Sequence, residues 1–196
     1  METNPILIFI AAVFPHNIAL TYILGMCPLI AISKSLKTAF GMGVSVVFVV
    51  TSTAIINWLV YNLLLVPFKA EILSYVVFII MIAASVQLLE MILERFFPAL
   101  QAVFGIFLPL ITVNCIVLAV SLFMVLRKYD FVTTIFFALG SSVGWMLAIV
   151  TVAAIRGRLA LVSDVPKGLR GAGITMVILG ILSLAFMGFA GMVRIQ

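Results

Sequence analysis

The stretch FVTTIFFALGSSVGWMLAIVTVAAI, from Phe131 to Ile155, contains no charged side chain. Roughly 20 apolar residues in a helix cross the hydrocarbon core of a bilayer, so this stretch predicts a transmembrane helix. Its apolar residues are continuous rather than alternating, which argues against a strand of a membrane β-barrel. The whole chain has the same character: 66% of its residues are hydrophobic and 9% are charged. Such a chain cannot cover itself with a solvated surface, so its surface must face lipid.

Charged residues divide the 196-residue chain into six uncharged runs. The runs are 4–33, 38–68, 72–89, 98–126, 131–155 and 171–193. Each is long enough for one span, so we predict an all-α integral membrane protein with six transmembrane helices in a single domain, residues 1–196. No basic n-region or cleavage site precedes the first run, so a cleavable signal peptide is not expected. The net charge of +5 lies in short clusters between the runs, as topology signals do, and does not indicate nucleic-acid binding.

The distribution of Lys and Arg predicts the orientation of the chain. If the N-terminus is outside, seven basic residues fall in cytoplasmic loops and four lie outside. The positive-inside rule therefore favours both termini on the periplasmic side. Trp58 and Tyr61 would then lie near the outer interface, where aromatic residues are enriched.

The first and fourth runs are too long for straight helices. At 1.5 Å per residue the fourth would reach about 42 Å, against a hydrocarbon core of about 30 Å. Both runs carry helix breakers: Pro15, Asn17, Gly25 and Pro28 in the first, and Gly105, Pro109 and Asn114 in the fourth. We expect interrupted or re-entrant helices in both runs. Irregular backbone is tolerated in a membrane only where protein buries it or where it lines a cavity.

Two similar segments relate the halves of the chain. Cys27-Pro-Leu-Ile-Ala-Ile-Ser33 and Cys115-Ile-Val-Leu-Ala-Val-Ser121 share Cys, Ala and Ser in register. Each lies in the first, interrupted run of a three-run half, residues 1–95 and 98–196. An odd number of spans per half predicts inverted repeats, whose equivalent points meet near the middle of the membrane. The two cysteines of the chain would then face each other.

Three interpretations of Cys27 and Cys115 are open at this point. Free cysteines are usually small buried hydrophobes. A disulfide is geometrically possible, but nothing in a membrane requires one. Metal ligation fits better, because thiolates suit iron–sulfur clusters, zinc or Cu(I), and a [2Fe–2S] cluster usually takes four cysteines. A similar partner protein would then supply the other two ligands, and the N-termini of broken helices would offset the negative charge of the cluster.

Glu90 and His16 are the other candidate functional residues. Ionisable groups at membrane depth are functional candidates, and Glu90 lies one turn deeper than Glu94 and Arg95, which mark the interface. We therefore interpret Glu90 as a candidate for a cation pathway. His16 precedes Cys27 by eleven residues and is expected to have a structural or interfacial role.

Small residues recur at helical spacing in the last two runs. Gly140, Gly144 and Ala148 are four residues apart and predict that another helix approaches closely, either within this chain or from a neighbouring protein. The small residues of the last run have the same interpretation. They are Gly180, Ser183, Gly188 and Gly191.

Several motifs resemble those of a known family. They are Leu24-Gly-Met-Cys27, Glu90-Met-Ile-Leu-Glu-Arg-Phe-Phe-Pro98, Gly105-Ile-Phe-Leu-Pro-Leu-Ile-Thr-Val-Asn-Cys115, Gly144-Trp-Met-Leu-Ala-Ile-Val150 and Ser163-Asp-Val-Pro-Lys-Gly-Leu-Arg170. Over essentially the whole chain the sequence resembles the E-type subunit (NqrE) of the sodium-translocating NADH:quinone oxidoreductase. The family comprises the paired D-type and E-type membrane subunits of that complex and the A-type and E-type subunits of the Rnf complex. The stretch that ends at Cys115 is highly specific to this type of subunit and its relatives.

The resemblance implies a translocase subunit of the bacterial inner membrane, in a complex that oxidises NADH, moves Na⁺ and reduces ubiquinone. Cys27 and Cys115 match cysteines that ligate an intramembrane [2Fe–2S] cluster together with two cysteines of the homologous D-type subunit. Glu90 matches an acidic residue implicated in sodium movement. FAD, FMN and riboflavin are then expected elsewhere in the complex, which also contains A-, B-, C- and F-type subunits.

Two features of the sequence are closer to the Rnf complex. They are Pro28 and the ending Ser183-Leu-Ala-Phe-Met-Gly-Phe-Ala-Gly191. An A-type subunit of the NADH:ferredoxin Rnf complex is therefore the alternative assignment. From other classes, a secondary transporter without a cluster and a structural scaffold compete with both. A cation carrier should hold several carboxylates or polar clusters at depth, and here only Glu90 qualifies.

Overall fold

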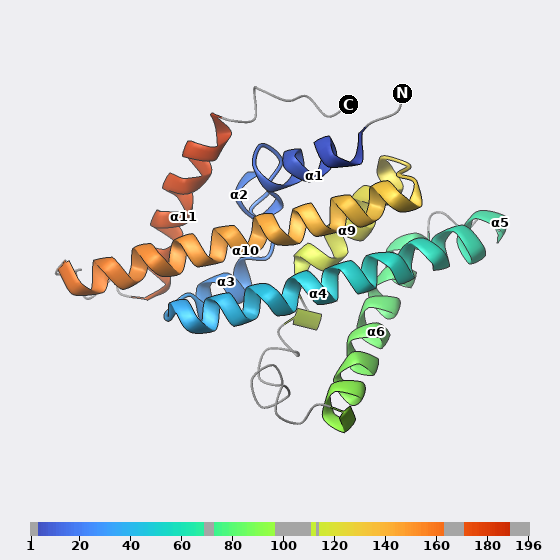
Figure 1. Cartoon of the computed structure of the whole chain (residues 1–196), viewed down its shortest axis with the longest axis horizontal. Coiled ribbons are helices and arrows are strands. Elements are labelled where there is room, and N and C mark those ends of the chain that lie inside the picture. Colours follow the sequence, from blue (N-terminus) through green and yellow to red (C-terminus); the bar gives the residue numbers. More distant parts are fainter. Residues whose placement is uncertain (1–3, 69–72, 97–110, 113, 163–170, 189–196) are drawn as a thin grey trace.

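The computed structural model describes residues 4–68, 73–96, 111, 112, 114–162 and 171–188. Every regular element within these ranges is a helix, which confirms the predicted all-α fold. Two long helices, α4 (Leu36–Val60) and α10 (Phe131–Val162), pack side by side (Figure 1). They run antiparallel, because Trp58 near the end of α4 packs edge-on against Phe131 at the start of α10, with ring centroids 4.9 Å apart.

The two long helices follow from continuous apolar sequence without proline. α4 continues into a π-helical turn (Tyr61–Leu65) and a last short helix, α5 (Val66–Phe68). The 30 residues from Leu36 to Leu65 and the 32 residues of α10 are long and apolar enough to cross a membrane. A glycine brings the pair together, since Gly43 of α4 lies directly against the side chain of Met146 of α10.

α10 extends beyond its predicted end. The uncharged run stops at Ile155, but the helix continues through Arg156 and Arg158 to Val162. Arginine is a good helix former, and its long side chain carries its charge away from apolar surface. The first charge therefore marks the end of the apolar run and not the end of the helix.

The first run is not one helix, which confirms its predicted interruption. It forms α1 (Pro5–Val13), α2 (Ile18–Thr21) and α3 (Met26–Ile32). Asn17 ends the first break and caps α2, because its Oδ1 accepts a hydrogen bond from the N–H of Ala19 at 3.0 Å. Gly25 ends the second break with a φ of +76°, a left-handed conformation that favours glycine.

The fourth run is also interrupted where a breaker was predicted. Asn114 caps α9 (Cys115–Leu126), and its Oδ1 accepts from the N–H of Ile116. Gly105 and Pro109, the other predicted breakers, lie outside the described residues. The 12 residues of α9 extend for about 18 Å, which is less than the hydrocarbon core.

The remaining helices are α6 (Ser74–Phe96) and α11 (Ala172–Met187). The described residues include two helices that are both long and apolar enough to cross a membrane, Leu36–Leu65 and Phe131–Val162. Shorter apolar stretches lie at Tyr75–Leu88 within the 23-residue α6, at Cys115–Leu126 and at Ala172–Met187. They do not form six uninterrupted spans, because the first run is divided among three helices and α9 begins at a break. Outside this part of the chain, residues 98–110 contain most of the remaining fourth run.

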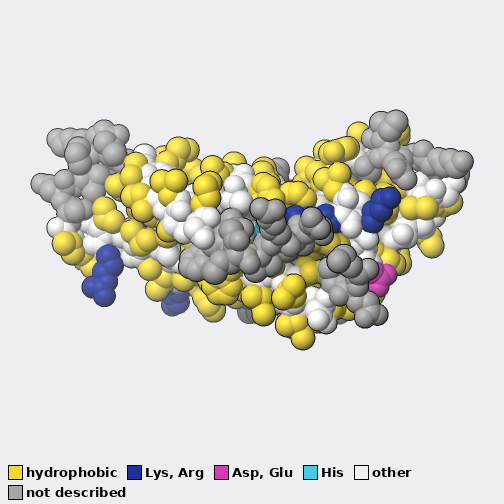
Figure 2. All heavy atoms as spheres, turned by 90° about the horizontal axis from the view of Figure 1, so that it is seen from above, with side chains coloured by type: hydrophobic (Ala, Val, Ile, Leu, Met, Phe, Trp, Pro, Cys, Tyr) yellow, Lys and Arg dark blue, Asp and Glu magenta, His cyan; other side chains and the backbone are white. Residues whose placement is uncertain are grey.

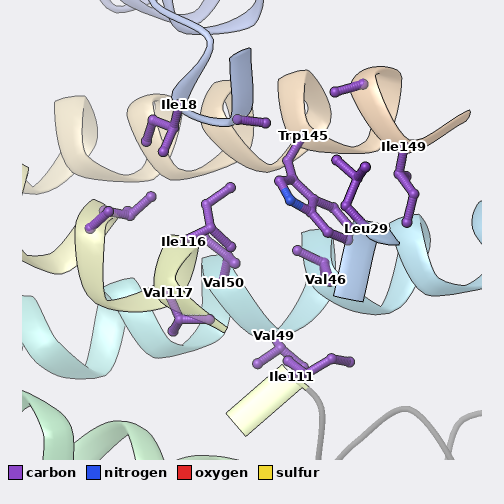
Figure 3. Packing of buried hydrophobic residues seen from close by; sticks show 14 of the residues in the cluster. Ile18, Leu29, Val46, Val49, Val50, Ile111, Ile116, Val117, Trp145 and Ile149 are labelled. Carbon is purple, nitrogen blue, oxygen red and sulfur yellow. The ribbon is translucent and has the colours of Figure 1, made fainter. Parts of the chain in front are cut away.

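One apolar core joins α2, α3, α4, α9 and α10 (Figure 3). Its largest fully buried side chain is Trp145, which points from α10 toward Leu29 of α3 and Val46 of α4. The outer surface is apolar as well, and hydrophobic side chains cover most of the described face in Figure 2. Exposed Phe40 and Phe48 on α4 are examples. Such a surface is suited to lipid rather than water.

Contacts at the two ends of the long helices group the charged loops. At one end, Nε1 of Trp58 donates to the carbonyl of Tyr129, so α4 ends beside the turn between α9 and α10. At the other end, Nη1 of Arg156 donates to Oγ of Ser33 at 2.6 Å and to the carbonyl of Ile30 at 3.3 Å. The loop after α3 and the basic end of α10 therefore lie together, and the predicted orientation places both on the same side of the membrane.

Candidate metal site at two helix breaks

Cys27 lies where a helix restarts after a break. It is the second residue of α3 and follows Gly25, whose left-handed backbone returns the chain to a helix. Pro28 comes next, and proline is tolerated in a first helical turn because the N–H there has no helical partner. The side chain of Cys27 is exposed in this chain. The short helix α3 thus places the thiol of Cys27 at the surface of this chain and not in its core.

Cys115 has the equivalent place in the second half of the chain. It is the first residue of α9 and directly follows the cap residue Asn114. Its thiol is also exposed, and neither cysteine forms a disulfide. Neither thiol is therefore part of the buried core of this chain.

The two breaks touch each other. An added Cβ on Gly25 would lie 2.9 Å from Oδ1 of Asn114, closer than real Cβ atoms come to a neighbour. Gly25 precedes Cys27 by two residues, and Asn114 precedes Cys115 by one. Segments far apart in the sequence therefore meet at the turns that carry the two cysteines. The absence of a side chain at Gly25 is what permits this approach.

Trp145 holds this junction from the side of α10. Its indole is fully buried, and Nε1 donates a hydrogen bond to the carbonyl of Gly25 at 3.2 Å. The same nitrogen would lie 2.6 Å from a Cβ on Gly25. Sequence reasoning identified Trp145 only as part of a family motif. Its position one residue after Gly144, on a helix with a small-residue stripe, was the available signal for a close contact.

The small-residue stripe of α10 packs against α1. A Cβ on Gly140 would lie 2.8 Å from the carbonyl oxygen of Phe9, and one on Gly144 would lie 3.1 Å from the carbonyl oxygen of Ala12. Ala148 is also fully buried. The stripe therefore serves packing within this chain, which was one of its two predicted roles.

The small residues of α11 behave differently. Among the described residues, a Cβ on Gly180 would meet nothing within 4 Å, and one on Gly188 would meet the carbonyl oxygen of Ala185 in its own helix at 3.3 Å. Ser183 donates from Oγ to the carbonyl of Leu20 at 2.6 Å, so that position does contact α2. Gly191 lies outside the described residues.

Asn17 closes the first break of the chain, and sequence reasoning identified it only as a helix breaker. Its side chain is fully buried. While Oδ1 caps α2, Nδ2 donates to the carbonyl of Val13 at 3.1 Å and to that of Gly144 at 2.8 Å. One carboxamide thus joins α1, α2 and α10 and satisfies backbone groups that the break leaves free.

Asn114 closes its break only in part. Its side chain is 3% exposed, and Oδ1 accepts from the N–H of Ile116, but the buried Nδ2 has no hydrogen-bond partner among the described residues. A buried donor without an acceptor is uncommon and costs about 1–3 kcal/mol. The positive end of the α9 dipole lies at the same turn, where the N–H groups of Ile116 and Val117 already bond to Asn114. Donors in excess beside a cysteine fit an anionic, sulfur-ligated group, so the residues present are compatible with a metal–thiolate centre.

The metal ligands available in the described part of the chain are incomplete. Those residues contain no group of three or more His, Cys, Asp and Glu side chains that could hold a metal ion. His16 lies in the first break, where its backbone N–H donates to the carbonyl of Ala11. Glu90 lies in α6, but its side chain is outside what the structure describes. The cysteines would therefore need ligands from elsewhere.

The apolar surface, the long paired helices and the cysteines at two joined breaks define a multi-pass integral membrane protein with a candidate redox-metal site. The family model described as "Rnf-Nqr subunit, membrane protein" matches residues 6–193. The chain belongs to this family. It is a membrane subunit of an ion-translocating electron-transport complex of the Rnf/Nqr type.

Proposed function

We propose that this chain is the E-type subunit of a sodium-translocating NADH:quinone oxidoreductase and carries electrons across the membrane through a [2Fe–2S] cluster. Cys27 and Cys115 would supply two of the four ligands, and a homologous D-type subunit would supply the other two. The contact between Gly25 and Asn114 carries this proposal, because it joins the turns that bear the two cysteines.

The residues of this chain have distinct parts in that role. When bound, the cluster supplies a one-electron carrier inside a hydrocarbon core of about 30 Å, a long gap between carriers on opposite faces. The thiolates of Cys27 and Cys115 would hold it from this side of the shared site. The N-terminus of α9 would offset its negative charge, since helix N-termini stabilise anions. Trp145 would keep the two turns together through its hydrogen bond to Gly25.

The architecture we propose is a pair of inverted three-span repeats, residues 1–95 and 98–196, with both termini periplasmic. Two observations support it. Each half contributes one of the two helices that are long and apolar enough to cross a membrane, and these two helices pack antiparallel to each other. Each half also places its cysteine in the first turn of a helix that follows a break.

The rest of the complex follows from the same proposal. The A-, B-, C- and F-type subunits would carry FAD, FMN and riboflavin, with NADH as donor and ubiquinone as acceptor in a bacterial inner membrane. Glu90, in the second half of α6, would contribute a fixed negative charge to the path of Na⁺. In Glu90→Gln complexes the apparent affinity of turnover for Na⁺ should fall while the iron content stays constant. Unchanged sodium activation would return Glu90 to a structural role.

The second candidate is the A-type subunit of an Rnf complex. Pro28, which this relative favours, lies in the first turn of α3, where either type could carry it. Purified complex supplied with NADH separates the two candidates through its acceptor. Reduction of ubiquinone without reduction of ferredoxin supports the quinone reductase, and the reverse result supports the Rnf complex.

Cysteine variants of the assembled complex test the cluster. Cys27→Ala and Cys115→Ala each remove one ligand with little change in volume. We expect loss of the intramembrane cluster's iron and of ubiquinone reduction, whereas NADH oxidation by a soluble artificial acceptor persists because it precedes the membrane crossing. Leu126→Ala, at the exposed far end of α9, is the matched control and should behave as wild type. Full iron content and wild-type ubiquinone reduction in an assembled cysteine variant would contradict the proposal.

A further inference from the structure

Four basic residues gather where α10 ends and α4 begins. Lys34 and Lys37 lie around the first residue of α4, and Arg156 and Arg158 lie in the last two turns of α10. The hydrogen bond from Nη1 of Arg156 to Oγ of Ser33 joins the two groups, because Ser33 directly precedes Lys34. One end of the pair of long helices therefore carries four positive charges.

The described part of the chain does not neutralise these charges. The side chains of Lys34, Lys37 and Arg158 are exposed. Asp130 is the one acidic residue whose side chain the structure describes, and it directly precedes α10. About 39 Å of helix separates it from Arg156. This end lies on the left in Figure 2, where Lys and Arg side chains are visible and no described Asp or Glu side chain is. It is therefore suited to a partner with negative charge.

An exposed apolar stripe runs along α4 away from these charges. Its members are spaced by four residues and are roughly half exposed: Leu36, Phe40, Val44 and Phe48. The stripe extends for about 18 Å, close to half of a hydrocarbon core of about 30 Å. The helix that carries it is long and apolar enough to cross a membrane. The stripe therefore has the length of one leaflet, with positive charge where it begins.

We propose that this end of the helix pair binds an anionic phospholipid, whose phosphate is held by Lys34, Lys37 and Arg158 and whose acyl chain lies along the stripe of α4. The inference goes beyond the proposed function and does not depend on the cluster. Inorganic phosphate would satisfy the charges but leave the stripe unused, whereas a lipid has the negative charge and the apolar chain in one molecule. Each basic residue near the headgroups contributes about a fivefold preference for anionic lipid.

A photoreactive side chain on the stripe tests the inference in the whole complex. Phe40→benzoylphenylalanine places a cross-linker one turn after Leu36. The purified complex is reconstituted in vesicles of equimolar phosphatidylglycerol and phosphatidylcholine and then irradiated, and mass spectrometry of the peptide around position 40 gives the ratio of the two lipid adducts. We expect phosphatidylglycerol to be favoured, and Lys37→Gln to lower that preference about fivefold. High salt should lower it as well, because exposed charges are screened.

Lys37→Arg and Lys128→Gln are the matched controls. The first keeps the positive charge and should retain the preference for phosphatidylglycerol. The second removes one exposed positive charge at the other end of α10, in the turn before Phe131, and should leave the adduct ratio at position 40 unchanged. Arg156 is not substituted, because its hydrogen bonds to Ser33 and to the carbonyl of Ile30 hold the loop in place.

The opposite results would overturn the inference. Equal labelling by the two lipids would show that the charges select no headgroup, and a preference that survives Lys37→Gln would show that it arises elsewhere. A cross-link to another subunit in place of lipid would make this end a protein contact. Loss of the preference on addition of inorganic phosphate at constant ionic strength would show that the site takes the free anion. None of these results bears on the cluster, which the cysteine variants test separately.

Discussion

Asn17 and Asn114 each cap a helix that follows a break, but their side chains differ in how many of their polar atoms are hydrogen-bonded. Each ends a break in an apolar run and caps the helix that follows through Oδ1. At Asn17 both polar atoms of the side chain are satisfied, because Nδ2 reaches carbonyls on α1 and α10. At Asn114 the buried Nδ2 finds no acceptor in the part of the chain that the structure describes. The described residues thus satisfy the whole side chain at Asn17, whereas at Asn114 they satisfy only Oδ1.

The difference shows where this protein tolerates an incomplete hydrogen-bond pattern. Backbone freed by a break inside a membrane must be satisfied, since no water is available there. In the Asn17 region, the side chain of Asn17 donates to carbonyls of α1 and α10. This is possible because α1 packs closely against Gly140 and Gly144 of α10. The Asn114 region instead keeps a donor beside an exposed cysteine. The two breaks therefore differ in how completely the chain itself satisfies the polar side chain that closes them.

The largest expected effect is that of a bulky side chain placed where α1 packs closely against α10. Gly140→Val places a branched side chain where a Cβ would already lie 2.8 Å from the carbonyl oxygen of Phe9. Backbone cannot yield as a flexible side chain does, so we expect a loss of about 3 kcal/mol or more, seen as poor assembly of the complex. Gly157→Val, on the same helix but with open space around its Cβ, is the control. Equal yields of the two variants would contradict the tight contact between α1 and α10.

Changing both asparagines to aspartate compares the regions directly. Asn17→Asp keeps the cap but turns the Nδ2 donor into an acceptor that faces two carbonyl oxygens. We expect it to destabilise the complex by about 3 kcal/mol, because buried acceptors then repel each other. Asn114→Asp breaks no hydrogen bond that Nδ2 makes to the described residues, but it buries a carboxylate, so it should cost less than Asn17→Asp, about 1–2 kcal/mol. Melting temperatures of the two variants check the ranking, and equal values would mean that the breaks do not differ.

Gly25→Ala tests the point where the breaks touch. The methyl group meets Nε1 of Trp145 and Oδ1 of Asn114, and the backbone φ of +76° is unfavourable for alanine. We expect a cost of about 2 kcal/mol in stability, together with a lower iron content because the cysteine turns are pushed apart. Gly41→Ala, which has open space around it, should change neither measurement. Wild-type iron and stability in Gly25→Ala would show that the contact is not required.

Trp145→Phe should have the smallest effect. Phenylalanine retains most of the buried aromatic volume and loses the hydrogen bond to the carbonyl of Gly25. The cost should be about 1 kcal/mol, as for one buried hydrogen bond, and it should be measured as a small drop in melting temperature. Trp58→Phe, which loses a similar bond to Tyr129 at the far end of α4, is the control for iron content. A change in iron content for Trp145→Phe alone would confirm that this residue holds the junction.

Sequence reasoning predicted the elements better than their ends and contacts. The breaks at Asn17, Gly25 and Asn114 follow from residues that favour caps and left-handed turns, and the structure confirms them. The predicted end of α10 is too early, because charge limits the apolar run and not the helix, which continues to Val162. Interruption of the first run was predicted, but its division into three separate helices is a property that only the structure shows.

The sequence by itself determined that the chain lies in a membrane, that its long apolar runs are helical and that breaks precede both cysteines. These are local consequences of composition, of spacing, and of what glycine, proline and asparagine do to a backbone. Only the tertiary structure decided that Gly25 lies against Asn114, that Trp145 bonds to their junction, and that one amide is satisfied while the other is not. Residues so far apart carry no mutual signal in a single sequence, because their proximity arises from how the starts of α3 and α9 pack against each other and against α10.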